Sequence, residues 1–348
     1  MAAETRLSHV DGARGELVMA GHRLEDLAHM EFEDVVALLW TAAGAAGAAR
    51  VVAEPLPGAT LLLLRDAARR NLMPMDALRM ATGTLVADSD QAAMTLLVGA
   101  IPTIVAAYSR LVGGAEPLQP LVGLGLAANY LYMSTGTAPH AELVRALNVY
   151  LTTVADHGLN ASTFTARVIT STGSDFVSAV TGAIGALKGP LHGGAPGPAL
   201  DMVFEIGSAD RAESMLRQKL AAGERLMGFG HRVYKVRDPR ADVLGAAAGR
   251  MFTRAGDMRL YDLARAVETV ALRLLREHKP DRPLQTNVEF YTALLLHGLG
   301  LEAAQFTPTF AIGRAAGWTA HCLEQRASGR LIRPESVYVG CQPKDRAA

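Results

Sequence analysis

Residues 226–240 read LMGFGHRVYKVRDPR and set a histidine directly behind a glycine-flanked aromatic residue. Gly228 and Gly230 can adopt positive φ and let the backbone approach a bound molecule closely. This pattern is typical of a ligand-binding turn. We therefore predict that the backbone amides around Phe229 are free to bind a flat ligand and that His231 lies at the mouth of the turn.

Two further stretches carry the same kind of chemistry. Residues 188–195 read KGPLHGGA and place His192 between a proline and two glycines, and residues 286–291 read TNVEFY with Glu289 near the start of a helix. Two loop histidines and one carboxylate are a sufficient set for acid/base chemistry. Simpler alternatives stay open, because His192 fits an ordinary loop and Glu289 fits a capping box with Thr286 as the N-cap.

The composition favours a helical protein that binds small molecules. The chain has 348 residues, which allows one large domain or two ordinary ones. Half of the residues are hydrophobic and only 5% are aromatic, and the many alanines and leucines favour helices. A formal net charge of zero argues against a nucleic acid or an anionic membrane surface as the partner.

The cysteines and the most apolar stretch favour a cytoplasmic protein. Cys322 and Cys341 have neither a metal-binding nor a redox spacing, and the start of the chain does not resemble a signal peptide. The apolar stretch 94–108 contains Pro102 and is shorter than the roughly 20 residues of a membrane-spanning helix. We expect it to form a buried helix.

Apolar spacing and capping residues predict the secondary structure. An extended segment is expected over residues 5–20. Helices are expected over 32–43, 61–70, 75–88, 91–111, 141–156, 175–187, 200–207, 211–222, 240–255, 261–279 and 308–326.

Two of these helices carry residues of interest. The last helix places Arg314, Gly317, Trp318 and His321 on one face, where the arginine is too close to the apolar stripe to be simply solvated. His157 follows the helix predicted over 141–156, where it could equally be a surface histidine at a helix C-terminus.

The motifs resemble those of the citrate synthase family. G-P-L-H-G-G-A, M-G-F-G-H-R-V-Y-K-x-x-D-P-R and N-V-E-F-Y occur in the family's order. The resemblance extends to TRLSHVDGARGEL (5–17), ADHGLNASTFTAR (155–167), GRAAGWTAHCLEQ (313–325) and RLIRP (330–334). It covers nearly the whole chain except roughly residues 45–130.

The resemblance implies a mainly α, two-domain helical fold and an obligate homodimer. Residues 1–194 and 306–348 would form a large domain, and residues 195–305 a small domain that closes over the substrates. The implied reaction joins acetyl-CoA to oxaloacetate through an enolate and then hydrolyses citryl-CoA. Acetyl-CoA is a co-substrate in this scheme, and no permanently bound cofactor, metal, nucleic acid or membrane is expected.

The resemblance also assigns roles to individual residues. Glu289 would remove the methyl proton of acetyl-CoA, His192 would bind the thioester carbonyl, and His231 would polarise the ketone of oxaloacetate. The implied oxaloacetate ligands are His157, Arg240, Arg314 and, from the partner subunit, Arg333. The implied CoA contacts are Met227, Gly228, Gly230 and Lys235.

Some positions depart from the family pattern. Aspartate is the commonest family residue at position 289, and glutamate reaches about 1 Å further. Pro196 replaces a frequent asparagine and Val154 a frequent histidine, from which we expect altered affinity. An additional N-terminal domain that senses NADH in some bacterial members is not expected here, nor is its regulation.

Three alternatives remain at this point. A 2-methylcitrate synthase would use propionyl-CoA, because one extra methylene in a pocket changes discrimination by only about 1–3 kcal/mol. A catalytically silent acyl-CoA or dicarboxylate binding protein would have kept the site without the base. A helix-bundle scaffold without a ligand would leave the glycine-flanked histidines unexplained.

Overall fold

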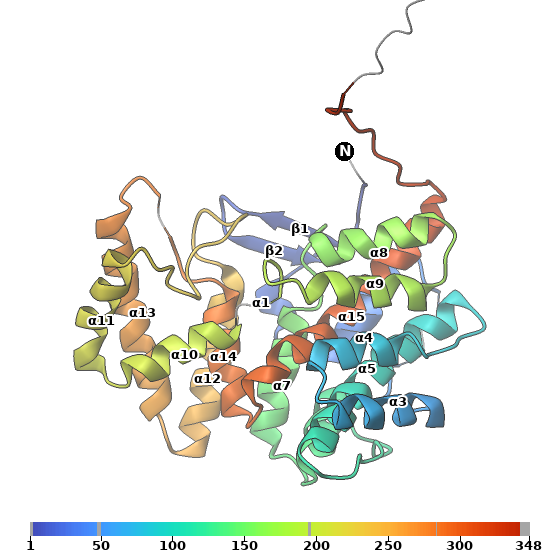
Figure 1. Cartoon of the computed structure of the whole chain (residues 1–348), viewed down its shortest axis with the longest axis horizontal. Coiled ribbons are helices and arrows are strands. Elements are labelled where there is room, and N and C mark those ends of the chain that lie inside the picture. Colours follow the sequence, from blue (N-terminus) through green and yellow to red (C-terminus); the bar gives the residue numbers. More distant parts are fainter. Residues whose placement is uncertain (1–2, 47–49, 194–195, 283, 342–348) are drawn as a thin grey trace, which may run out of the picture.

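The computed structural model describes residues 3–46, 50–193, 196–282 and 284–341, and over these residues the protein is mainly helical, as predicted (Figure 1). The elements in chain order are β1 (Ser8–Asp11), β2 (Glu16–Met19), β3 (His22–Arg23), α1 (Leu24–Leu27), α2 (Phe32–Ala42), α3 (Gly58–Arg69), α4 (Pro74–Thr82), α5 (Asp90–Val112), α6 (Leu126–Thr135), α7 (Ala141–Thr153), α8 (Ala161–Ser171), α9 (Phe176–Leu187), α10 (Pro196–Ile206), α11 (Ala209–Ala221), α12 (Pro239–Ala255), α13 (Arg259–His278), α14 (Val288–Gly298), η1 (Ala303–Gln305) and α15 (Phe306–Ser328).

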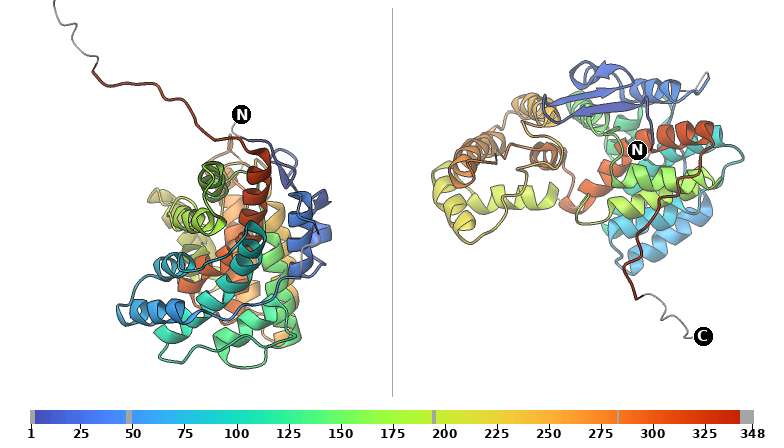
Figure 2. Two further views of the ribbon diagram at one scale, coloured as in Figure 1. Left: turned by 90° about the vertical axis from the view of Figure 1, so that its right-hand side faces the viewer. Right: turned by 90° about the horizontal axis from the view of Figure 1, so that it is seen from above.

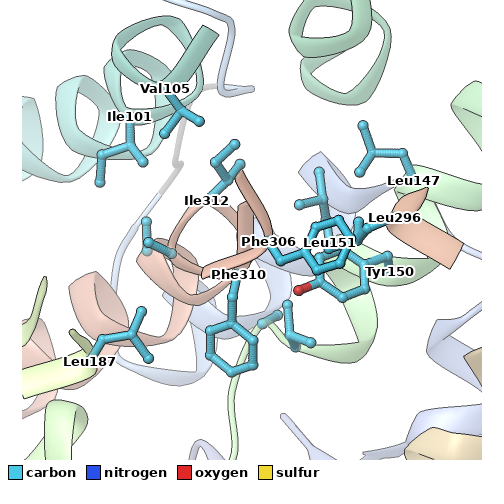
Figure 3. Packing of buried hydrophobic residues seen from close by; sticks show 14 of the residues in the cluster. Ile101, Val105, Leu147, Tyr150, Leu151, Leu187, Leu296, Phe306, Phe310 and Ile312 are labelled. Carbon is cyan, nitrogen blue, oxygen red and sulfur yellow. The ribbon is translucent and has the colours of Figure 1, made fainter. Parts of the chain in front are cut away.

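Helix α15 lies at the centre of the fold, where α2, α5, α7, α8 and α9 pack around it. Figure 3 shows its residues Phe306 and Ile312 among apolar side chains of α5 and α7. Two glycines allow this close packing, as predicted. A Cβ atom at Gly317 would lie 2.4 Å from the carbonyl oxygen of Ala155, and one at Gly313 would lie 2.8 Å from the carbonyl oxygen of Leu151. Because α15 lies so close to residues 151–155 at these two glycines, Arg314 between them is buried in the interior of the protein.

Helix α5 is the buried apolar helix that the sequence predicted, and it continues through Pro102. The helix runs for 23 residues with the proline inside, close to the predicted range 91–111. A proline within a helix removes one backbone hydrogen bond, and here the surrounding residues from Leu97 to Tyr108 are all buried. By length and composition α5 could cross a membrane, yet 78% of its apolar window is buried inside the protein. It is therefore a core helix.

Helices α10 to α13 lie together at one side of the molecule (Figures 1 and 2). Helix α11 packs on α13, and α10 and α12 pack on α14. Helices α12 and α14 in turn contact α7, which joins this group to the helices around α15. The division into domains 1–194 with 306–348 and 195–305 stays a prediction. Its boundary at 194–195 and the end of the chain at 342–348 lie outside the described residues.

The segment predicted to be extended forms part of a small antiparallel sheet with strand order β1-β2-β3. Ser8 pairs with Met19 and Asp11 with Glu16, so a short turn joins β1 to β2. The buried residues of this sheet, Leu17 and Met19, belong to the main core. The sequence indicated the extended conformation but not the strand pairing.

Four predicted helix boundaries were wrong by three or more residues, and one of them is the start of the helix predicted from residue 61, which begins at Gly58. The helix predicted over 75–88 ends at Thr82, and the helix predicted over 141–156 ends at Thr153. The second ends early because α15 binds the following backbone, with the carbonyl oxygen of Val154 accepting from Arg314 at 2.7 Å. The helix predicted over 200–207 begins at Pro196, since proline is well suited to a first helical turn.

Candidate active site

The glycine-flanked turn at 227–231 is held against the segment that leads into α14. Gly230 N–H donates to the carbonyl oxygen of Gln285 at 2.7 Å, and Asn287 N–H donates to that of Gly228 at 2.9 Å. Phe229 and Thr286 thereby form an antiparallel bridge. Gly228 and Gly230 have φ values of 87° and 86°, as predicted. The expectation that all amides of this turn are free was wrong, because the Gly230 amide is used in the bridge.

His231 follows this turn with its imidazole held in one orientation. Its Nδ1 accepts hydrogen bonds from the backbone amides of Val233 at 3.1 Å and Tyr234 at 3.0 Å. The imidazole proton therefore belongs on Nε2, which can donate to a ligand oxygen. Burial, together with the nearby Arg240 guanidinium, lowers the pKa of His231 to about 4. His231 is thus a neutral hydrogen-bond donor near pH 7.

Glu289 lies in the first turn of α14, on the other side of the same bridge. The N-cap of this helix is Asn287, whose side chain accepts from the Glu289 amide at 3.0 Å. The capping box with Thr286 as N-cap was therefore wrong, because the Thr286 hydroxyl instead donates to the buried Glu268 at 2.6 Å. The Glu289 carboxylate is not needed for capping.

The surroundings of Glu289 favour its protonated form. Burial raises the pKa of Glu289 to about 7, although the Arg240 and Arg314 guanidiniums oppose the shift. A carboxyl group with this pKa changes its protonation state near neutral pH. It therefore has the acidity expected of a general base in an enclosed site.

Arg240 is buried and held by Asp238, a residue that the sequence analysis did not select. Asp238 Oδ1 accepts from Arg240 Nε at 3.0 Å, and its Oδ2 accepts from the terminal Arg240 nitrogen at 2.8 Å. Oδ2 also accepts from the Val288 amide at 3.1 Å, so the same carboxylate joins α12 to α14. Burial would lower the pKa of Arg240, but Asp238 outweighs it and the pKa is raised. The sequence does contain a local indication of the Asp238 position: in D-P-R (238–240), aspartate before proline is typical of the start of a helix.

His157 lies beside His231 and is not a surface residue at a helix end, so that alternative was wrong. The two imidazole centroids are 5.8 Å apart, and His157 Nε2 is 3.2 Å from the Tyr234 hydroxyl. Burial, followed by the charges of Arg240 and Arg314, lowers the pKa of His157 well below its usual value. His157 is therefore also neutral. Tyr234 was missed from the sequence, where nothing distinguished it from a core aromatic residue.

His192 is oriented by Ser162, a second residue that the sequence analysis missed. The Ser162 hydroxyl lies 2.8 Å from His192 Nε2 and accepts from the Trp318 indole at 3.1 Å. Because Nε2 is occupied, Nδ1 is the ring nitrogen that remains to contact a ligand. Burial lowers the pKa of His192 to about 4, with a smaller contribution from Arg314. The charge of Arg314 also acts on Glu289 and His157, so all three groups lie within electrostatic range of the same guanidinium.

Arg314 is almost completely buried on α15. Its Nε donates to the Val154 carbonyl at 2.7 Å, and its guanidinium carbon lies 4.7 Å from the Phe310 ring centroid. Burial lowers the pKa of Arg314 to about 10, which still leaves it charged at neutral pH. A buried cation next to neutral imidazoles is an arrangement that favours a bound anion.

The remaining predicted residues lie at the periphery. Met227 is half-buried in the glycine-flanked turn, and Lys235 is exposed on the segment after His231. Arg333 is exposed in the extended tail beyond α15, which leads away from the rest of the chain (Figure 2). The structure of one chain thus brings together His157, His192, His231, Arg240, Glu289 and Arg314, but not Arg333.

The known proteins with similar sequences reported below all belong to one family. Residues 1–335 match the family model described as citrate synthase, C-terminal domain. A relative named citrate synthase from Haloferax volcanii is 38% identical over 98% of this chain and 94% of its own length. A relative named 2-methylcitrate synthase from Mycobacterium tuberculosis is 39% identical over 97% of this chain and 88% of its own length.

Solved structures agree with this match. Citrate synthase from Pyrobaculum aerophilum has a TM-score of 0.86 and 33% identity, covering 99% of this chain and 92% of its own. A ternary complex of carboxymethyl coenzyme A and oxaloacetate with citrate synthase from Thermoplasma acidophilum has a TM-score of 0.84 and 26% identity, covering 99% of this chain and 96% of its own. The chain belongs to the citrate synthase family.

Proposed function

We propose that this chain condenses acetyl-CoA with oxaloacetate and hydrolyses the resulting citryl-CoA to citrate and CoA. The observation that carries the proposal is a buried carboxyl group, Glu289, whose pKa burial raises to about 7 within electrostatic range of Arg240 and Arg314. The same two guanidiniums act on the neutral imidazoles of His231 and His192, respectively. The methyl group of a thioester is a very weak acid, so a base removes its proton only if the enolate oxygen is stabilised at the same time.

The steps follow from the three side chains. Glu289 takes a methyl proton of acetyl-CoA, and His192 donates a hydrogen bond from Nδ1 to the thioester oxygen as the enolate forms. The enolate carbon then attacks the ketone carbon of oxaloacetate, and the alkoxide that forms accepts a hydrogen bond from His231 Nε2 and takes up the proton that Glu289 removed. Water finally cleaves the thioester, releasing CoA and citrate.

Oxaloacetate is proposed to bind between His157, Arg240 and Arg314. The two guanidiniums are buried, and arginine provides paired donors that match a carboxylate. An ion pair at about 4 Å with an effective dielectric constant near 20 contributes roughly 4 kcal/mol before desolvation. A dianionic substrate therefore offsets the mutual repulsion of the two cations.

CoA is proposed to bind along the glycine-flanked turn. The backbone at Met227, Gly228 and Gly230 would contact the adenine, and Lys235 would contact a phosphate. The support is that Lys235 is exposed next to this turn and that the Thermoplasma acidophilum relative was solved with a CoA derivative. Lys235→Ala is expected to raise the KM for acetyl-CoA without changing that for oxaloacetate.

The homodimer, the closing small domain and the cytoplasmic location remain proposals. Arg333 is proposed to complete the oxaloacetate site of the partner subunit, which fits its position on a tail that leads away from its own chain. The shared arginine is tested by mixing the Arg333→Ala and Glu289→Gln variants so that their subunits exchange. Each mixed dimer would contain one intact site, so random mixing is expected to restore about a quarter of wild-type activity. No recovery would contradict a shared arginine.

The reaction is tested by CoA release after oxaloacetate and acetyl-CoA are added together. Release that requires both substrates supports the proposal, and its absence would favour a silent binding protein. Glu289→Gln, which is nearly the same size, is expected to lower kcat at least 100-fold while oxaloacetate still binds. Unchanged turnover would remove Glu289 as the base.

The second candidate is 2-methylcitrate synthesis, because the relative with that name is as similar as the citrate synthases. The same assay with propionyl-CoA separates the two. A higher kcat/KM for propionyl-CoA than for acetyl-CoA would make this chain a 2-methylcitrate synthase.

A further inference from the structure

The first residue of β1 holds the backbone on both sides of His157. The Ser8 hydroxyl donates to Asp156 Oδ2 at 2.6 Å and accepts from the Gly158 amide at 2.8 Å. These two partners are the residues immediately before and after His157 in the chain. A single hydroxyl group therefore closes a small ring that contains the His157 backbone.

Asp156 is itself fixed from the opposite side by α15. It is completely buried, and His321 Nε2 lies 3.2 Å from its Oδ2. His321 Nδ1 lies 3.0 Å from a terminal nitrogen of the buried Arg167, so the imidazole proton belongs on Nε2 and is donated to Asp156. Burial would raise the pKa of Asp156, but His321, the Ser8 hydrogen bond and the charge of Arg314 together outweigh it and the pKa is lowered. Ser8 thus binds to the same carboxylate oxygen that His321 contacts from the other side.

The same hairpin also contacts the segment that orients His231. The carbonyl oxygen of Gly12, in the turn after β1, accepts from the Lys235 amide at 2.8 Å. A Cβ atom at Gly12 would lie 2.3 Å from the carbonyl oxygen of Val233, so only glycine fits. The hairpin therefore contacts the backbone next to both histidines: Ser8 binds the neighbours of His157, and Gly12 binds the segment that follows His231.

We propose that Ser8 is a positioning residue for His157, acting through Asp156 and Gly158. This inference rests on the proposed function, which assigns His157 to oxaloacetate. Ser8 is bonded to neighbours of the histidine and not to the imidazole. Its loss is expected to change the placement of the ring and leave the acetyl-CoA side of the site intact.

The kinetic test compares three variants of the full-length protein. Ser8→Ala removes the hydroxyl and is expected to raise the KM for oxaloacetate about 10-fold, with the KM for acetyl-CoA at saturating oxaloacetate within about twofold of wild type. Ser8→Thr keeps the hydroxyl and is expected to restore the KM for oxaloacetate. Thr5→Ala is the matched control, because among the described residues the Thr5 hydroxyl accepts from the nearby Leu7 amide, at 3.1 Å, and is hydrogen-bonded to neither Asp156 nor Gly158.

Two kinetic results would overturn the inference. One is an unchanged KM for oxaloacetate in Ser8→Ala, and the other is an equal increase in Thr5→Ala. Should Ser8→Ala fail to fold, Ser8→Cys keeps the shape and weakens both hydrogen bonds. The cysteine variant is then expected to raise the same KM by a smaller factor, and no change would count against the inference.

A spectroscopic measurement separates this inference from the proposed function. In protein labelled with ¹⁵N-histidine, the His157 ring signals are identified by their loss in His157→Gln. Ser8→Ala is expected to shift these signals, whereas Thr5→Ala is not. Unshifted signals would overturn the positioning role even if the enzyme is active, and a wild-type chain that releases no CoA would overturn only the proposed function.

Discussion

The protonation of Glu289 predicts how the rate depends on pH. Burial raises its pKa to about 7, so the carboxyl group is mostly protonated below pH 7 and cannot accept a proton. The pKa values of His192 and His231 are lowered to about 4, so neither imidazole changes charge between pH 6 and pH 8. Of these three groups, only the carboxyl group titrates in that window.

The magnitude follows from the ionised fraction. With a pKa of about 7, roughly 9% of the Glu289 carboxyl groups are ionised at pH 6 and roughly 91% at pH 8. The kcat/KM for acetyl-CoA should therefore rise about tenfold over these two pH units. Bound oxaloacetate adds negative charge nearby and would raise the pKa further, so tenfold is a lower bound. A glutamate with an ordinary pKa would leave the rate almost constant.

The assay is CoA release at saturating oxaloacetate across this pH range. Acetyl-CoA with a deuterated methyl group provides a control, because an isotope effect shows that proton removal limits the measured rate. Glu289→Asp keeps a carboxylate on a shorter side chain and is the matched variant. A flat profile between pH 6 and pH 8 in the presence of the isotope effect would refute the assignment of Glu289 as a buried base.

Three further predictions concern stability and binding. Asp238→Asn removes the partner of the buried Arg240 and is expected to destabilise the fold by about 3–5 kcal/mol and to weaken oxaloacetate binding, measured by denaturant unfolding and calorimetry. Gly228→Ala is expected to lower Tm more than Gly223→Ala, because both have positive φ but only a Cβ atom at 228 would contact a neighbouring ring, at 2.9 Å. Glu289→Gln is expected to become more stable relative to wild type, by up to roughly 3 kcal/mol, as pH rises from 4.5 through 7. The sign follows because a carboxyl group with a raised pKa stabilises the fold at low pH and loses that contribution when it ionises. A difference in unfolding free energy between variant and wild type that is the same at pH 5 and pH 8 would contradict this prediction.

The helical fold was predictable because its signals are local. Apolar spacing located α15 and indicated that Arg314 is not simply solvated, and the side chains of Ser89 and Asn160 cap α5 and α8 in the structure. Helix ends were predicted less well where tertiary contacts decide them. The helix before His157 ends early because Arg314, 160 positions away in the sequence, binds the Val154 carbonyl.

The candidate site was predicted as a set of residues but not as a network. Motifs located the histidines, the arginines and Glu289, since each lies in a distinctive stretch. Ser8, Ser162 and Asp238 bind to residues of the site or to their neighbours, and their roles depend on which segments meet in space. Hydrogen bonds over such distances leave no periodic pattern in the sequence.

The antiparallel bridge between Phe229 and Thr286 has a consequence for protein engineering. His231 and Glu289 lie just beyond the two short segments that this bridge joins, although 57 intervening residues form α12, α13 and the connections around them. In a chimera of two related enzymes, a crossover point within that interval would take the two halves of the bridge from different parents. Crossovers placed before residue 226 or after residue 291 would transfer both side chains as one matched unit.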